Sequence, residues 1–260
     1  MIANISQLIQ AKDLLWSWVL RIIRARYQQS VLGWLWAIIQ PAATVVVFTV
    51  IFTYFVPIDT GEIPYPIFSY VAVIPWTFLA ASLSDMTTSI VGNMNLVTKI
   101  YFPREALTVA ALLSRLMDLG ISVALLVILI LIYQVPIFPL GWLFLPLILL
   151  IQIALILGCG LLAAAMNVFY RDVGSILPLG IQLWFYASPI IYPVTMVPEQ
   201  LRPFYFLNPM AGILEAYRAV LLYQTMPGNY LLYSGVISLV VFLIGYWFFK
   251  RVEYLFADII

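Results

Sequence analysis

Six long apolar runs constrain this chain more than any other feature of the sequence. Each is long enough to cross about 30 Å of hydrocarbon, which takes roughly 20 helical residues. Backbone groups in lipid must be satisfied within their own segment, and these runs do not alternate as barrel strands would. The sequence therefore predicts an all-α integral membrane protein with spans at residues 33–56, 66–91, 107–132, 142–167, 173–191 and 230–249.

The composition excludes an ordinary soluble domain and a nucleic-acid-binding protein. Of the 260 residues, 65% are hydrophobic and 9% are charged, whereas a typical soluble domain has about 25% charged residues. The net charge of +1 leaves too few cations to neutralise a run of phosphates. One cysteine and no histidine offer no metal site.

The basic residues predict how the chain is oriented. With the N-terminus inside, only Arg202 and Arg218 fall in outer segments. The cytoplasmic segments then hold nine basic residues, which are Lys12, Arg21, Arg24, Arg26, Lys99, Arg104, Arg171, Lys250 and Arg251. Because basic residues concentrate in cytoplasmic loops, we expect both termini in the cytoplasm.

Two segments outside the spans have their own pattern. Residues 1–32 contain apolar side chains at helical spacing between 8 and 27, which predicts an amphipathic helix in the headgroup plane. Residues 192–229 are apolar, but their best run is too short for a span and contains charges. We expect two short re-entrant helices there, the second beginning at Asn208 and Pro209, a favourable cap and first position.

The chain has no nucleotide-binding P-loop of its own. Such a loop needs a lysine after glycine, and the three lysines follow Ala11, Thr98 and Phe249. No nucleophile–base pair suggests an enzyme either. Any pumping would therefore draw its energy from a partner or an ion gradient.

Three charges fall within the spans: Asp85, Arg115 and Asp118. Counted from the cytoplasmic boundaries, Asp85 and Arg115 lie at similar depth, and Arg115 and Asp118 are neighbours on one helix. One interpretation is an ion or proton relay. The other, which we favour, is a structural salt bridge between spans two and three, because arginine does not readily release its proton.

The fifth predicted span differs from the others in its polar and helix-breaking residues. It contains Pro178, Gly180, Gln182, Ser188 and Pro189. Proline leaves a carbonyl unpaired, so such a helix usually faces protein or water rather than lipid. This pattern indicates a pore-lining helix.

Four motifs resemble the ABC-2 type export permeases, in the order of that family. They are RARYQQSVLGWLWAIIQP at 24–41, NMNLVTKIYFPREAL at 93–107, NVFYRDVGSILP at 167–178 and FLNPMAGILEAYR at 206–218. Within the family, the chain is most similar to O-antigen and capsular polysaccharide exporters of the Wzm type. The resemblance implies a homodimer in the bacterial cytoplasmic membrane, moving lipid-linked polysaccharide with two ABC ATPase subunits that hold the ATP and magnesium.

The resemblance also implies roles for particular residues. The first and fifth spans would line the channel, with candidates Phe48, Phe52, Gln182, Trp184, Tyr186 and Ser188. The N-terminal helix and the 93–103 segment would receive the ATPase motion. The wider cytoplasmic segment 92–106 contains the coupling candidates Asn95, Lys99, Tyr101, Phe102 and Arg104. We expect a short helix in the 92–106 segment, capped by Asn93 or Asn95. The outer helices would form a gate, with candidates Asn208, Pro209, Glu215 and Arg218.

Other functions stay open at this point. Teichoic-acid and other glycolipid ABC exporters share much of the motif pattern. An ion-coupled secondary transporter would use Asp85, Arg115 and Asp118, although we find no repeat symmetry of the kind common in that class. A scaffold or assembly factor would show no substrate-dependent stimulation of an ATPase.

Overall fold

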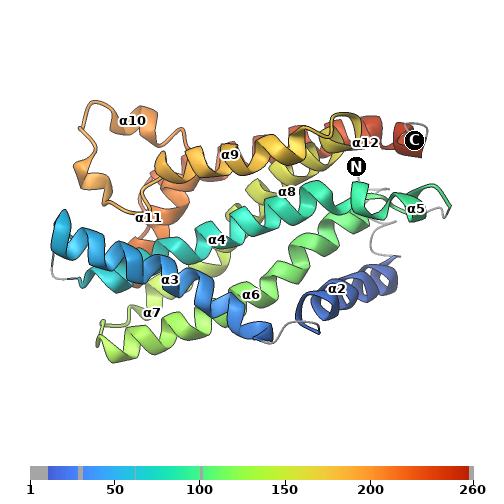
Figure 1. Cartoon of the computed structure of the whole chain (residues 1–260). Coiled ribbons are helices and arrows are strands. Elements are labelled where there is room, and N and C mark those ends of the chain that lie inside the picture. Colours follow the sequence, from blue (N-terminus) through green and yellow to red (C-terminus); the bar gives the residue numbers. More distant parts are fainter. Residues whose placement is uncertain (1–10, 29–31, 62, 100–101, 258–260) are drawn as a thin grey trace.

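The long helices of the chain lie side by side and reverse direction from one to the next (Figure 1). The computed structural model describes residues 11–28, 32–61, 63–99 and 102–257, and within these ranges every regular element is a helix. The long elements are α3 (Trp36–Val50), α4 (Tyr65–Ser89), α6 (Glu105–Ile132), α8 (Leu145–Phe169), α9 (Val173–Tyr186) and α12 (Tyr230–Val252). Helix α3 is continuous with the 3₁₀ helix η1 (Gly33–Leu35) before it and the π-helix η2 (Ile51–Phe55) after it. The all-α membrane architecture predicted from the sequence is confirmed.

Helix α9 is shorter than the fifth span expected from the sequence. Within the described residues, five helical stretches are long and apolar enough to cross a membrane, and α9 is not among them. Its 14 residues reach about 21 Å at 1.5 Å per residue. The expected end at residue 191 is wrong, because the residue before Pro189 is disfavoured in a helix and the chain turns there.

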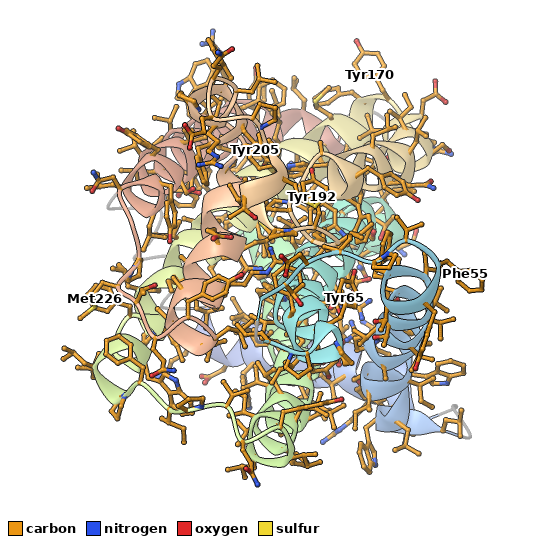
Figure 2. All side chains as sticks on the ribbon, turned by 90° about the vertical axis from the view of Figure 1, so that its left-hand side faces the viewer. Phe55, Tyr65, Tyr170, Tyr192, Tyr205 and Met226 are labelled. Atoms are coloured by element: carbon orange, nitrogen blue, oxygen red, sulfur yellow. The ribbon has the colours of Figure 1, made fainter. Side chains whose placement is uncertain are left out.

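The remaining helices lie at the two ends of the bundle (Figure 1). One end, here called the α5 end, carries α2 (Lys12–Tyr27), η3 (Val91–Asn93), α5 (Met94–Val97) and η5 (Glu253–Ala257). The other, the α11 end, carries α7 (Pro139–Trp142), η4 (Val194–Met196), α10 (Arg202–Tyr205) and α11 (Pro209–Leu221). Figure 2 looks onto the α11 end, where the Tyr192 and Tyr205 hydroxyls lie 3.0 Å apart.

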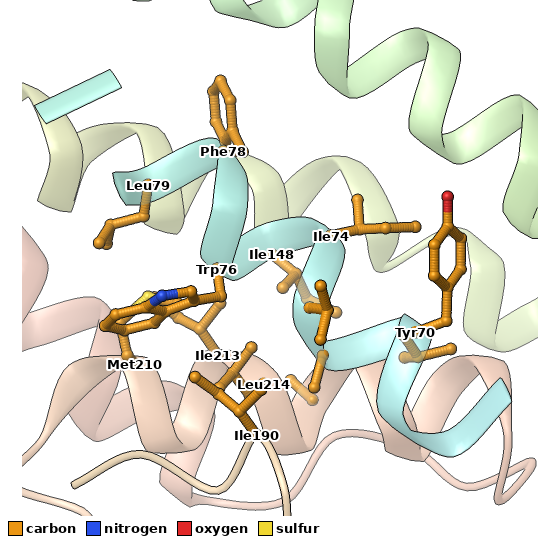
Figure 3. Close-up of a cluster of buried hydrophobic side chains, with 14 of the residues drawn as sticks. Tyr70, Ile74, Trp76, Phe78, Leu79, Ile148, Ile190, Met210, Ile213 and Leu214 are labelled. Carbon is orange, nitrogen blue, oxygen red and sulfur yellow. The ribbon is translucent and has the colours of Figure 1, made fainter. Parts of the chain in front are cut away.

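Helix α4 forms the centre of the bundle. Most of its side chains are buried, and its half nearest the α11 end packs against α8, α11 and the chain that follows α9 (Figure 3). Buried Gln152 of α8 adds a polar link, because its Nε2 donates to the Pro75 carbonyl at 2.7 Å and its Oε1 accepts from Tyr217 of α11 at 3.1 Å. Such interhelical bonds stabilise bundles in lipid, where apolar burial alone gives little preference.

Helices α8 and α12 approach each other closely at glycines. A Cβ placed on Gly245 would lie 2.1 Å from the Gly158 carbonyl oxygen, and one on Gly158 would lie 2.6 Å from the α12 backbone. Gly160 faces α4 instead, where a Cβ would meet the Met86 side chain at 2.3 Å. Small residues therefore let three helices pack at short distance.

Helix α11 begins where the sequence predicts. The Asn208 side chain accepts a hydrogen bond from the Met210 amide at 3.1 Å, and Pro209 occupies the first turn. Most of the following side chains are buried. At 13 residues α11 is too short to span, so the chain enters the α11 end of the bundle and leaves again on the same side.

Candidate functional site

A row of aromatic side chains joins α3, α4 and α9. The Phe48 ring lies 5.9 Å from Phe185 and 6.0 Å from Phe52. Trp76 of α4 lies 5.6 Å from Phe185 and 5.9 Å from Trp184, both edge-on. Such edge-to-face pairs add to the apolar burial that holds aromatic clusters together. The row fixes α9 against the core although no residue of α9 is itself buried.

The six channel-lining candidates separate into two groups. In the first group, the side chains of Gln182 and Tyr186 on α9 are exposed. Phe48, Phe52 and Trp184 are half-buried and pack against the core. Ser188 is only 1% exposed, and its hydroxyl donates to the Trp184 carbonyl at 2.8 Å. Gln182 and Tyr186 are therefore the candidates that face away from the rest of the chain.

Asn208 connects the end of α9 to the start of α11. Its Oδ1 accepts from Trp184 Nε1 at 2.8 Å in addition to capping α11. Its Nδ2 donates to the Ser188 hydroxyl at 2.9 Å and to the Ala187 carbonyl at 3.1 Å. One predicted gate residue thus binds two predicted channel residues, a link that the sequence spacing of 20 to 24 residues does not reveal.

Arg218 of α11 forms a second link to the chain after α9. It is fully buried, and it donates to the carbonyl oxygens of Ile190 at 2.9 Å and Tyr192 at 3.4 Å. Its guanidinium lies 3.8 Å from the centre of the Phe68 ring, and Glu215 Oε2 lies 4.0 Å from Nη1. Arg218 and Asn208 together tie α11 to the segment that ends α9.

Arg26 of α2 joins the three charges predicted within the spans in a four-residue cluster, here called the charge node: Arg26, Asp85, Arg115 and Asp118. Asp85 accepts from Arg115 Nε and from Arg26 Nη2, both at 2.7 Å. Asp118 accepts from Arg26 Nη1 at 2.8 Å and from Arg115 Nη1 at 3.0 Å. The node joins α2 to α4 and α6, and its formal charges sum to zero.

Sequence reasoning missed the part that α2 plays in this node. Arg26 was counted only among the cytoplasmic cations. The signal was a charge count, because two carboxylates and one arginine within the spans leave one negative charge without a partner. A cavity of ≈ 340 Å³ opens beside the node and is also lined by Trp36, Gln40 and Phe78.

Tyr27 extends the node by donating its hydroxyl to Asp118. Burial, and then the hydrogen bond to Asp118, raise the pKa of Tyr27 to about 12. The phenol therefore stays protonated at neutral pH and acts as a donor. Both carboxylates are held by several donors each, which favours the structural interpretation over a proton relay.

The 92–106 segment lies at the α5 end and contains the coupling candidates. Asn95 and Lys99 are exposed, Phe102 and Arg104 are half-buried, and Tyr101 lies outside the described residues. The expected short helix is present as α5, but the expected side-chain cap is wrong. The Asn93 side chain instead donates to the Ser89 carbonyl at 2.8 Å, where the preceding helix leaves an acceptor free.

The sequence model of the ABC-2 type transporter family matches residues 13–222. This match covers most of the chain, including α2, the charge node, the 92–106 segment, α9 and α11. The chain belongs to the ABC-2 type transporter family. It is accordingly a multi-pass membrane transporter subunit, with five to six candidate spanning helices.

Individual ABC-2 relatives match over nearly their full length. The chain is 31% identical over 231 residues to the O-antigen export system permease protein RfbA of Myxococcus xanthus, covering 87% of each chain. It is 27% identical over 243 residues to the RfbA of Klebsiella pneumoniae, covering 92% of this chain and 91% of the relative. The polysialic acid transport protein KpsM of Escherichia coli is 28% identical over 248 residues, with 90% and 91% covered.

In this ABC-2 chain, the described residues contain no group of three or more His, Cys, Asp or Glu side chains that could hold a metal ion. Cys159 is a free, half-buried cysteine of α8. The candidate functional features are therefore two. One is the α3–α9 side with its attachment to α11, and the other is the α5 end with the charge node and the 92–106 segment.

Proposed function

We propose that this chain is the permease subunit of an ATP-driven exporter that moves lipid-linked polysaccharide across the bacterial cytoplasmic membrane. The observation that carries the proposal is the near full-length similarity to permeases named for O-antigen export and polysialic acid transport. A sugar polymer is the substrate class that these names share. A lipid anchor suits a polymer that begins at the membrane surface.

ATP hydrolysis is assigned to a separate subunit. No lysine in the chain follows glycine as a P-loop requires. We propose two copies of a cytoplasmic ABC ATPase, which bind ATP and magnesium and dock against α2 and the 92–106 segment. This places the α5 end in the cytoplasm, in agreement with the concentration of basic residues there.

The polymer path is assigned to the space between two copies of the chain. Helix α3 exposes Val46 and Val47, and α9 exposes Leu179 and Leu183, each by more than half of its surface. Both helices are joined through the aromatic row, so they form one side of the protomer. A second copy facing this side would place Gln182 and Tyr186 along a shared passage, where an amide and aromatic rings suit sugar hydroxyls and sugar faces.

The arrangement gives an ion-coupled mechanism less support. Asp85 and Asp118 would have to release or bind an ion during transport. Each instead accepts hydrogen bonds from two guanidinium groups, and the node is neutral as a whole. Teichoic acid remains an alternative polymer under the same mechanism.

The proposal is tested by substituting Phe102, an apolar residue of the 92–106 segment. We expect Phe102→Ala to leave the permease inserted and folded but to reduce both co-purification of the ATPase and polysaccharide export, because aromatic contacts dominate many interfaces. Phe204→Ala is the control, since Phe204 is 71% exposed at the opposite end of the bundle.

Normal ATPase association and normal export in Phe102→Ala would remove the 92–106 segment as the coupling element. A wild-type chain that captures no ABC ATPase would contradict the proposed function itself.

A further inference from the structure

The described chain after α12 continues directly as the 3₁₀ helix η5 and packs against the protein. Terminal residues are usually poorly ordered unless contacts tie them down. Here Phe256 of η5 is fully buried. Its ring lies 5.5 Å from Phe249 and 6.0 Å from Phe169, edge-on in both cases. The segment Lys250–Phe256, here called the C-terminal brace, is therefore anchored by its apolar end.

The C-terminal brace is bound directly to the end of the 92–106 segment. The Arg104 side chain donates to the Glu253 carbonyl, and its guanidinium lies 5.9 Å from the centre of the Phe256 ring. Lys250 Nζ lies 2.6 Å from Glu105 Oε1 and 3.1 Å from Glu253 Oε1. Glu105 is buried, so a close cation is needed to offset the cost of removing its charge from water.

The 92–106 segment needs such support. Helix α5 has four residues, far fewer than an isolated helix requires for stability. Val97 is buried in the same apolar cluster as Phe256, and Phe102 packs against that cluster. Exposed Asn95 of α5 and exposed Lys99 in the turn after it therefore belong to a short segment whose buried side packs in the same cluster as Phe256.

We propose that the C-terminal brace is a working part of the ATPase interface, in which Phe256 and Lys250 are positioning residues that hold the 92–106 segment ready for docking. The inference rests on the proposed function, because it assumes that this segment receives the ATPase. The family match ends at residue 222, so the brace lies outside the matched part of the chain.

The first test measures the 92–106 segment in the purified permease, without any ATPase. We expect Phe256→Ala to speed hydrogen–deuterium exchange of the amides between residues 94 and 107 several-fold and to leave α8 unchanged away from Phe169. Ile130→Ala is the matched control, because Ile130 is also buried, near the α11 end of α6. Unchanged exchange of the 94–107 amides in Phe256→Ala would overturn the proposal, whatever the substrate or partner proves to be.

The second test measures coupling. We expect Phe256→Ala to retain less ATPase and to export less polymer per folded permease, and Phe256→Leu to keep most of both. Ile130→Ala should lower only the amount of folded protein. A chain ended after Val252 repeats the test without altering any side chain of a span, should Phe256→Ala fold poorly. Wild-type association and export in that shortened chain would overturn the proposal. Loss of association in Phe256→Ala while Phe102→Ala binds normally would instead contradict docking at the 92–106 segment.

Discussion

At the scale of single residues, the charge node is the feature with the strongest energetic consequence. Its side chains are between 18% and 28% exposed, so each charge is largely removed from water. Asp85 and Asp118 each form an ion pair with both arginines, Arg26 of α2 and Arg115 of α6. Removing one carboxylate leaves two guanidinium groups sharing the other.

The first residue-scale prediction concerns Asp85→Asn. We expect it to lower the free energy of unfolding by about 1–2 kcal/mol, a range taken from polar interactions between membrane helices and the cost of unpaired charge. Export should fall only in proportion to the amount of folded permease. The measurement combines thermal unfolding in detergent with export per folded molecule.

The control for this prediction is Asp59→Asn, which changes an exposed carboxylate that accepts a hydrogen bond from the Gly61 amide of its own turn. It should alter stability little. An Asp85→Asn permease that is fully stable but has lost transport, with a shifted pH dependence, would support the relay interpretation instead.

At the scale of elements, hydrogen bonds attach α11 to the end of α9 and to the chain that follows it. Helix α9 ends early, and the chain after it is tied to α11 by Asn208 and Arg218. A motion of α9 would therefore carry the start of α11 with it. This gives a physical basis for treating the proposed channel helix and the proposed outer gate as one moving unit.

The element-scale prediction is that Asn208→Ala lowers stability by about 2 kcal/mol, because it removes a helix cap and leaves the Trp184 N–H without its acceptor. Asn229→Ala is the matched control. Asn229 also precedes a helix, α12, but its side chain makes no capping bond. Chemical denaturation should separate the two variants, and equal effects would show that the Asn208 bonds contribute little.

At the scale of the whole molecule, the two ends of the bundle should lie on opposite sides of the membrane. Phe55 and Met226 lie at opposite sides of the α11 end in Figure 2, and the 92–106 segment lies at the other end (Figure 1). The expected orientation rests on the basic residues, most of which are at the α5 end.

The whole-molecule prediction uses single cysteines in a chain with Cys159→Ala. Cysteines replacing Asp59 and Met226, both exposed at the α11 end, should react with an impermeant thiol reagent added to intact cells. A cysteine replacing Lys99 should react only after the membrane is permeabilised. External labelling at Lys99 in intact cells would reverse the assignment. Met226 is preferred to Gly228, where a Cβ would meet the Tyr230 ring at 2.5 Å.

Several features could be predicted because they depend on short stretches of chain. The cost of placing polar backbone in lipid determines that apolar runs of about 20 residues form helices, and it does so for each run separately. The start of α11 depends only on the asparagine, the proline and the next two residues. The missing P-loop is likewise a local fact about three lysines.

The remaining features depend on residues that are distant in the sequence. Arg26 reaches Asp118 across 92 positions, and Arg104 reaches Glu253 across 149. Neither pairing can be recognised from a local sequence pattern. The hydrophobicity of a helix indicates whether it enters the membrane, but it does not indicate which helix will pack beside it. The sequence alone therefore determined the class of protein and most of its spans. Only the tertiary structure decided that α2 closes the charge node, that α9 ends at Tyr186, and that the C-terminal brace contacts the 92–106 segment.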